Sequence, residues 1–288
     1  MRIRVIDAFT DRPFTGNPAG VCLLAGDDWP GEGWPEEQWM RHVAAELALS
    51  ETAFAHPLPS GGEADWALRW FTPTTEVDLC GHATLATAYA MHTDRGAPGT
   101  VRFASRSGVL TTHTHADGTV TLDFPATALE PTEPDDRFAA ALGATPTAAY
   151  RTGALGDLLL VLADEPTVTQ LTPDLTAVAE LTAELGIRGV ITTAAAANPA
   201  AGYDFVSRFF APAAVGVPED PVTGSAHTAL APYWSGQLGR DRLTGRQTSR
   251  RGGIVHTTLR GDRVELTGTA VTVWDGRLHH PPPWPPAR

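Results

Sequence analysis

Two motifs that precede small-residue helices hold the side chains best suited to chemistry. EVDLCGHAT spans residues 76–84 and EDPVTGSAH spans residues 219–227. In each motif a glycine at the predicted helix start is followed by a hydrogen-bonding side chain, His82 or Ser225. Free N–H groups and the dipole at a helix start favour an anion, such as a substrate carboxylate or a developing enolate. The two motifs together therefore predict a site for a small carboxylate.

Each glycine also has a structural explanation when it is taken alone. Gly81 and Gly224 fit turns that lead into helices, and His82 fits a capping side chain. Glycine at these places also lets a substrate approach the backbone closely. The occurrence of both motifs at matching positions favours the functional interpretation.

A glutamate near the end of the first predicted helix is the leading candidate for proton transfer. Glu51 lies in LALSETAFAH (residues 47–56) among apolar neighbours. We expect partial desolvation to raise the pKa of its carboxyl group toward the range useful for acid–base catalysis. Composition alone favours a surface glutamate instead. A racemase with two opposing thiols is excluded because Cys22 and Cys80 both lie in the first half, and we expect Cys80 to have a packing role.

The elements that carry these residues are predicted in the same order in both halves of the chain. RWFTP (69–73) corresponds to RFFAP (208–212), 139 residues later, and GHA corresponds to GSA, 143 residues later. We therefore predict two homologous α+β domains, residues 1–128 and 129–288, with corresponding loops facing an interdomain cleft. The second domain includes a proline-rich C-terminal tail, LHHPPPWPPAR, which we expect to be extended.

The composition narrows the classes of function. The chain has 288 residues and a net charge of −12, so we expect no binding to nucleic acid or to an anionic membrane. All 21 basic residues are arginine, which excludes a Schiff-base lysine and a Walker phosphate loop. Two cysteines make no disulfide framework and no apolar run reaches membrane-spanning length, so we expect a cytoplasmic protein. The HTH and HH segments form no recognisable ligand set, and we expect no metal.

Several longer stretches resemble the PhzF-like family, which is named for the phenazine-biosynthesis isomerase. They are DAFTDRPFTGNPAGV, LSETAF, RWFTPTTEVDLCGHATLA, SRFFAPAAVGVPEDPVTGSAHTAL and RQTSRRGGIV. The resemblance implies two pseudo-symmetric domains of the diaminopimelate-epimerase type, each a β-barrel-like sheet around a central helix. It also implies a homodimer, and catalysis without a metal or an organic cofactor.

The resemblance also implies roles for particular residues. Glu51 of SETAF matches the family's acid/base, and His82 of CGHAT matches an active-site histidine. Asp220 and Ser225 of DPVTGSA match residues that hold and polarise the substrate. Asp220 is then interpreted as a catalytic or orienting group that the helix N-terminus keeps ionised, and its neighbour Glu219 as a solvated residue.

The roles of two further segments are not fixed by the sequence. Asn17 of GNPAGV is expected near the pocket, although an asparagine before proline also fits a turn. The segment RQTSRRGG around Gln247 departs from the GRPS form common in the family, so its contacts are not predicted.

The predicted function is that of a cofactor-independent isomerase that moves a proton on a small carboxylic acid. In the phenazine enzyme the substrate is a dihydro-hydroxyanthranilate, and a glutamate moves a proton between ring carbons. Two alternatives remain. One is an epimerase or racemase that uses Glu51 with Cys80 or His82 as the opposing acid. The other is a non-catalytic protein that binds a small molecule on the same fold.

Overall fold

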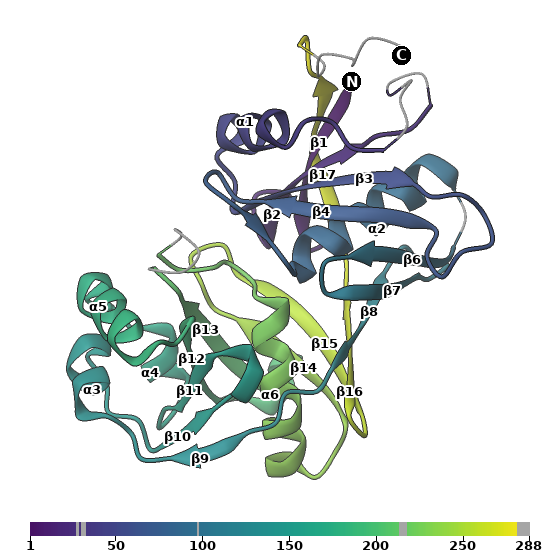
Figure 1. Ribbon diagram of the computed structural model, residues 1–288. Coiled ribbons are helices and arrows are strands. Elements are labelled where there is room, and N and C mark those ends of the chain that lie inside the picture. The colour runs from purple at the N-terminus through teal and green to yellow at the C-terminus, as the bar shows by residue number, and fades with distance from the viewer. Residues whose placement is uncertain (27–28, 30–32, 97, 213–217, 281–288) are drawn as a thin grey trace. The chain divides into compact units, whose positions relative to one another are not determined.

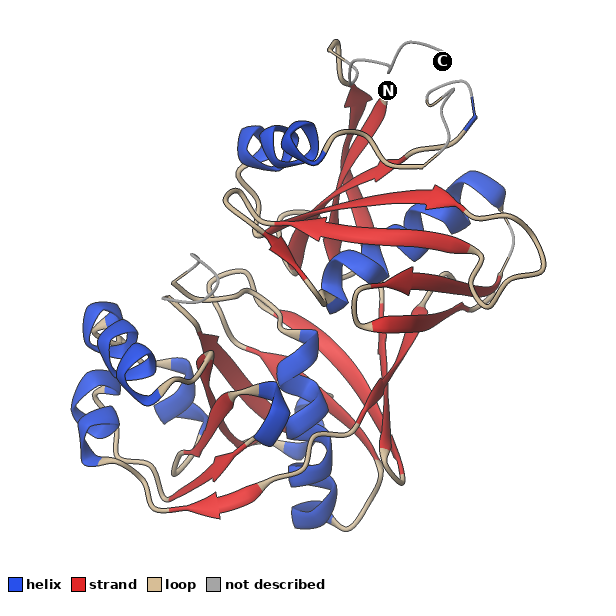
Figure 2. Ribbon diagram, viewed as in Figure 1, coloured by secondary structure: helices blue, strands red, loops and turns tan. Residues whose placement is uncertain are grey.

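A glycine-started helix of 15 residues lies among the strands of each half of the chain, α2 (Gly81–Arg95) and α6 (Gly224–Leu238) (Figures 1 and 2). The computed structural model describes residues 1–26, 29, 33–96, 98–212 and 218–280. The chain divides into two units. The first unit comprises Met1–Phe14, Pro18–Leu122 and the residues from Thr269 on, and the second comprises Thr15–Asn17 and Asp123–Gly268.

The first unit is a mixed sheet around α2. Its elements are β1 (Arg2–Ala8), β2 (Asn17–Leu23), α1 (Glu37–Leu47), β3 (Glu51–Pro57), β4 (Trp66–Phe71), β5 (Glu76–Val77), α2, β6 (Gly99–Ser105), β7 (Gly108–Thr114), β8 (Val120–Pro125) and β17 (Ala270–Arg277). The division between the two units falls within β2 and within β8. Strand β2 runs parallel to β3, β3 antiparallel to β4, β4 parallel to β6 and β6 antiparallel to β7.

Helix α2 is the centre of this unit. It packs against β1, β3, β7 and β17, and its side chains from the second residue to the eighth are all buried. Most of them are alanine or threonine, and such small side chains let strands approach the helix from several sides.

No helix in the described part of the chain is long and apolar enough to cross a membrane.

The second unit repeats this arrangement around α6. Its elements are β9 (Glu130–Thr132), α3 (Asp136–Leu142), β10 (Ala148–Arg151), η2 (Gly153–Leu155), β11 (Asp157–Val161), α4 (Glu165–Thr169), α5 (Leu175–Leu185), β12 (Gly189–Ala195), η3 (Pro199–Ala201), β13 (Phe205–Phe210), α6, β14 (Arg242–Gln247), β15 (Gly253–Arg260) and β16 (Arg263–Gly268). Strand β11 runs parallel to β12, β12 antiparallel to β13, β13 parallel to β14 and β14 antiparallel to β15.

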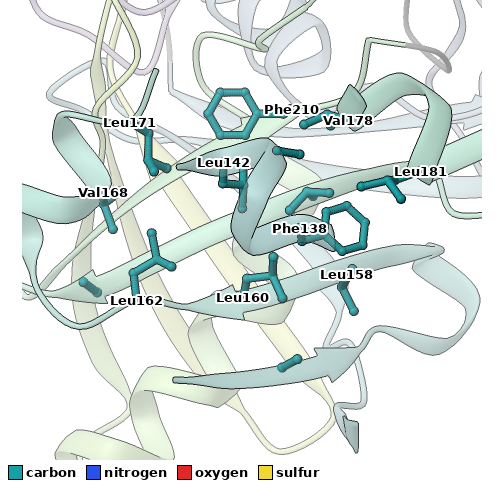
Figure 3. Packing of buried hydrophobic residues seen from close by; sticks show 14 of the residues in the cluster. Phe138, Leu142, Leu158, Leu160, Leu162, Val168, Leu171, Val178, Leu181 and Phe210 are labelled. Carbon is teal, nitrogen blue, oxygen red and sulfur yellow. The ribbon is translucent and has the colours of Figure 1, made fainter. Parts of the chain in front are cut away.

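Strand β11 of the second unit is buried on both faces. Alternate residues of β11 point to opposite faces, as in any strand. Leu158 and Leu160 join a cluster with Phe138 of α3 and Val178 of α5 (Figure 3). Leu159, between them, joins a second cluster with residues of α6, which include Ala226, Leu230 and Trp234. The continuous apolar run of this strand therefore follows from helices that cover both faces.

The predicted internal repeat is confirmed. The strands β4 and β13 have six residues each and start 139 positions apart, and the helices α2 and α6 begin at Gly81 and Gly224. The order of parallel and antiparallel pairs is also the same from β2 to β7 as from β11 to β15. The fold class is therefore the predicted one, α+β with two pseudo-symmetric domains.

The end of the chain differs from the expected division into residues 1–128 and 129–288. Strand β17 pairs antiparallel with β1 from Arg277 opposite Arg2 to Ala270 opposite Ala8. Residues from Thr269 on therefore belong with the first unit. The proline-rich tail that was expected to be extended lies mostly outside the described residues.

Candidate active site

In the first unit, the start of β3 and the start of α2 bring Glu51 and His82 together. Glu51 is the first residue of β3, and the parallel pairing of β2 and β3 places it beside Ala19. His82 is the second residue of α2. Both residues are buried, with 7% and 4% of their surfaces exposed. The distance from His82 Nε2 to Glu51 Oε2 is 3.4 Å.

Two further side chains contact the imidazole ring of His82. Ser50 Oγ lies 3.4 Å from Nε2, and Cys80 Sγ lies 3.5 Å from Nδ1. Burial lowers the pKa of His82 to about 3, so the ring is neutral near pH 7. Ser50 Oγ is the hydrogen-bonding partner of Nε2 and Cys80 Sγ that of Nδ1, and the tautomer of the ring decides which of them donates. The carboxyl group of Glu51 thus lies close to a neutral ring rather than to a cation.

The three side chains also contain potential metal ligands. Glu51, Cys80 and His82 each offer one possible ligand atom, and these three atoms lie within 4.8 Å of one another. In the described part of the chain this is the one group of three or more His, Cys, Asp or Glu side chains that could hold a metal ion. Cys80 and Glu51 approach different ring nitrogens of His82, whereas one imidazole nitrogen would have to face the ion together with both partners. The arrangement is therefore not that of a formed coordination shell.

Both central helices begin without a side-chain cap from the residue before them. Cys80 and Thr223 occupy the N-cap positions of α2 and α6, and neither makes a side-chain capping hydrogen bond. The first N–H groups of a helix have no partner within the helix. Each start, at Gly81 or Gly224, can therefore present N–H groups and a positive dipole end to an anion.

In the second unit, Asp220 lies four residues before the start of α6. Its Oδ1 accepts a hydrogen bond of 2.8 Å from Asn17 Nδ2, and its Oδ2 accepts one of 2.5 Å from Thr223 Oγ1. Asn17 Nδ2 also donates to the carbonyl of Val222 at 2.8 Å. Asn17 is thus a buried partner of the carboxylate and of the loop before α6.

Burial opposes the ionisation of Asp220 that the helix start was expected to favour. Burial raises its pKa to about 6, and the hydrogen bonds from Thr223 and Asn17 and the charge of Arg188 only partly offset this effect. Asp220 keeps some exposed surface as a residue, but its carboxyl group is enclosed by its partners. Near neutral pH it is still mostly ionised, and a modest change of surroundings would protonate it.

The segment around Gln247, whose contacts were not predicted, holds the loop before α6. The buried Gln247 accepts from Thr223 N at 2.9 Å through Oε1 and donates from Nε2 to the Asp220 carbonyl at 2.7 Å. Ser249 Oγ donates to the carbonyl of Pro221 at 2.8 Å. Arg251 donates to the carbonyl of Gly16 at 2.9 Å. One segment therefore fixes both the Asp220 loop and the residue directly before Asn17, which begins β2.

Glu219 is not the solvated neighbour that the sequence suggested. Its carboxylate receives two hydrogen bonds from Arg208 of β13, at 2.7 and 2.9 Å, and its side chain is 19% exposed. The first unit has the same pair at the repeated positions, with Arg69 of β4 donating to Glu76 at 2.7 and 2.6 Å. The pair is a repeated structural tie between the strand and the segment that leads to the helix.

Ser225, the second residue of α6, has a partner that sequence reasoning missed. Arg188 Nη2 donates to Ser225 Oγ at 3.0 Å. The same guanidinium donates to both oxygens of the buried Asp157, at 2.8 and 2.5 Å. Arg188 directly precedes β12 and Ser50 directly precedes β3, so the two residues correspond in the repeat. This correspondence is the sequence signal that could have identified Arg188 as a site residue.

The predicted site residues thus form two groups. Within the first unit, Glu51 and His82 lie together at the start of α2. Within the second, Asn17, Asp220 and Ser225 lie around the start of α6. The prediction that both helix starts serve one substrate stays a prediction. Cys22, which was expected to be a buried strand residue, is fully buried in β2, and burial raises the pKa of its thiol.

Comparisons with known proteins agree with these features. A family model described as "Phenazine biosynthesis-like protein" matches residues 6–276. An uncharacterized isomerase of Pseudomonas aeruginosa is 44% identical over 275 residues, which cover 95% of this chain and 97% of that protein. The crystal structure of a phenazine biosynthesis protein of the PhzF family from Enterococcus faecalis is 39% identical, with a TM-score of 0.85, over 97% of this chain and 99% of that one.

A more distant structure shows how widely the fold is shared. The crystal structure of a hydroxyproline epimerase from Agrobacterium vitis matches with a TM-score of 0.61 and 12% identity, over 96% of this chain and 91% of that one. This similarity concerns the fold alone. The extent of the family match and the 44% identity together show that the chain belongs to the phenazine biosynthesis-like, or PhzF-like, family of isomerases.

Proposed function

We propose that this protein is an isomerase that moves a proton on a small carboxylic acid, with Glu51 as the acid/base and without a metal or an organic cofactor. The observation that carries the proposal is the buried carboxylate of Glu51, 3.4 Å from the neutral imidazole of His82, beside a helix start that lacks a side-chain cap. Membership of an isomerase family supports the reaction class.

The internal repeat supports a single base. The strand β12 corresponds to β3, and its first residue is Gly189 where β3 has Glu51. A Cβ atom at Gly189 would lie 2.6 Å from the ring of Phe209 and 2.8 Å from the carbonyl oxygen of Phe210. The second unit therefore has no space for a carboxylate at this place. One group that removes a proton and returns it suits an isomerisation better than a reaction with two symmetric bases.

The chemistry assigned to each group follows from its type and surroundings. A C–H bond that is conjugated to a carboxylate or a double bond is acidic enough for a carboxylate to remove the proton, and general acid–base catalysis contributes roughly 10²–10⁴-fold. Donors at the helix starts stabilise the charge that then develops on the substrate. We propose that His82 donates a hydrogen bond as a neutral group, and that Asp220 and Ser225 hold polar groups of the substrate.

Deuterium exchange in heavy water tests the proposal. Small carboxylic acids are incubated with the protein and analysed by NMR, beginning with the dihydro-hydroxyanthranilate that the family resemblance implies. Wild type should exchange one position of its substrate, and Glu51→Gln should fold, bind and lose nearly all exchange, because an amide cannot accept and return a proton near pH 7. Glu51→Asp should be intermediate at best, because a carboxylate withdrawn by one methylene misplaces the reacting oxygen.

The same experiment separates the alternatives. Near wild-type exchange in Glu51→Gln would contradict the assignment and make His82 the next candidate. Loss of optical rotation together with exchange would support the epimerase alternative, for which Cys80, 3.5 Å from the His82 ring, is the available thiol. Binding without exchange would support a non-catalytic protein. Asp220→Asn and Ser225→Ala should weaken binding and turnover together, as expected for residues that hold the substrate.

A further inference from the structure

We propose that Arg188, held by the buried Asp157, is a positioning residue that orients the hydroxyl group of Ser225 and makes the start of α6 selective for a carboxylate. The inference rests on the proposed function, since it names the group that this part of the site recognises. It concerns residues of the second unit only.

The first step is the immobility of the Arg188 side chain. Its Nε and Nη2 atoms donate to the two oxygens of Asp157, whose side chain is fully buried. The parallel pairing of β11 and β12 sets Asp157 opposite Gly189, so the two partners come from adjacent strand starts. The guanidinium also lies 5.2 Å from the centre of the Phe209 ring. Bidentate pairing and contact with an aromatic face both restrict the direction of the remaining N–H groups.

The second step concerns the direction of the Ser225 hydroxyl. Arginine has donors and no acceptor, so Ser225 Oγ must be the acceptor of the 3.0 Å hydrogen bond from Arg188 Nη2. The hydrogen of that hydroxyl is then directed to a different acceptor. Ser225 keeps part of its surface exposed, and it stands at the uncapped start of α6. An incoming anion would meet an O–H donor, helix N–H groups and a fixed positive charge at one place.

The third step is the comparison with the other half of the chain. In the first unit the residue before β3 contacts the second residue of α2, with Ser50 Oγ 3.4 Å from His82 Nε2. In the second unit the corresponding residues are Arg188 and Ser225. The contact is thus present in both halves, but its chemistry differs. In the first unit two neutral side chains lie beside the carboxyl group of Glu51, and in the second the cation Arg188 precedes Gly189.

A purely structural ion pair is the competing explanation. Arg188 and Asp157 tie β11 to β12, and such a pair could serve the fold alone. The side chain of Arg188 nevertheless keeps 33% of its surface exposed, and its charge lowers the pKa of Asp220. With the hydrogen bond to Ser225, these features are what a role at the start of α6 requires, and a purely structural pair needs none of them.

The test uses benzoate and benzamide, two probes of the same shape that differ in charge. Calorimetric titration of the full-length protein at pH 7.5 should show a preference of wild type for benzoate. We expect Arg188→Gln to lose about tenfold or more of this preference, the usual scale for a hydrogen bond to a charged group. Arg188→Lys should recover part of the loss, because it restores the charge without the bidentate geometry.

A double-mutant cycle decides whether Arg188 acts through Ser225. If it does, Arg188→Gln should cost much less when Ser225 is already alanine. Arg137→Gln is the matched control, because this exposed arginine of the same unit makes a bidentate contact with Asp135. That variant should bind both probes as wild type does, and thermal melts should show that all variants are folded.

Three results would overturn the inference. They are equal binding of the two probes by wild type, an unchanged preference in folded Arg188→Gln, and independent losses in the double-mutant cycle. None of these depends on catalysis. Glu51→Gln should retain the preference for benzoate, so failure of the proton-transfer proposal and failure of this one are distinguishable.

Discussion

The replacement of Asp220 by asparagine should make the protein more stable at neutral pH. Burial raises the pKa of this carboxyl group to about 6 from an ordinary value of 3.8. A raised pKa means that the folded state binds the proton more tightly than the unfolded state. Stability from this group is fully present below pH 3.8 and is lost as the pH rises through 6. Asparagine keeps the size and can still bond Asn17 and Thr223, but it carries no charge.

The size of the effect follows from the same difference in pKa. The full difference between 3.8 and about 6 corresponds to about 3 kcal/mol at most. The free energy of unfolding of Asp220→Asn, relative to wild type, should therefore rise between pH 4 and pH 7 by up to this amount. We expect the gain to be smaller in practice, because the Thr223 hydroxyl must reverse its hydrogen bond to the amide.

Chemical denaturation at several pH values between 4 and 7.5 measures this difference, and the carboxyl carbon shift in NMR gives the pKa of Asp220 directly. Asp123→Asn is a suitable control, because this carboxylate is 43% exposed and pairs with Arg263. Its effect on stability should change little across the range. If Asp220→Asn follows wild type within about 0.5 kcal/mol at every pH, its carboxyl group is solvated and our account of its surroundings is wrong.

Three other predictions concern different parts of the structure. Cys80→Ala should keep most activity and chelators should have no effect, whereas loss of activity on chelation would show that the cluster around Cys80 binds a metal. Gln247→Ala removes hydrogen bonds to the backbone of residues 220–223, so denaturation should show a loss of about 1–3 kcal/mol and kinetics a raised KM. An unchanged KM would mean that other contacts fix residues 220–223. Gly189→Ala should cost about 1–3 kcal/mol through overpacking, whereas Gly236→Ala, with no atom near its Cβ position, should be neutral or slightly stabilising.

The repeat and the starts of the central helices were predictable because their signals are local. The phrases RWFTP and RFFAP, and GHA and GSA, lie within single elements. The hydrogen-bonding residues that follow Gly81 and Gly224 mark the two helix starts in the sequence itself. The pairing of Glu219 with Arg208 was also accessible, since the repeat sets an arginine and a glutamate at the same places in both halves.

Other features depend on contacts between distant segments. The pKa of Asp220 is raised by burial among segments distant in sequence, and one of its partners is Asn17, 203 positions away. The partnership of Arg188 with Asp157 depends on the parallel register of β11 and β12. The place of β17 beside β1 joins the two ends of the described chain. The alternating sequence AVTVWDGR favours a strand there, but no local pattern predicts that this strand pairs with β1.

The differences between the two halves say more about function than their similarity does. Where the first unit has Ser50, Glu51 and His82, the second has Arg188, Gly189 and Ser225 at the same three places of the repeat. A two-base racemase needs an acid or a base on each side, and Gly189 has no room for one. Under our two proposals, the first unit carries proton transfer, which requires a carboxylate shielded from water, and the second carries anion recognition, which requires a fixed cation and donors. We therefore expect a protein that returns a proton with the group that removed it, rather than one that inverts a centre between two bases.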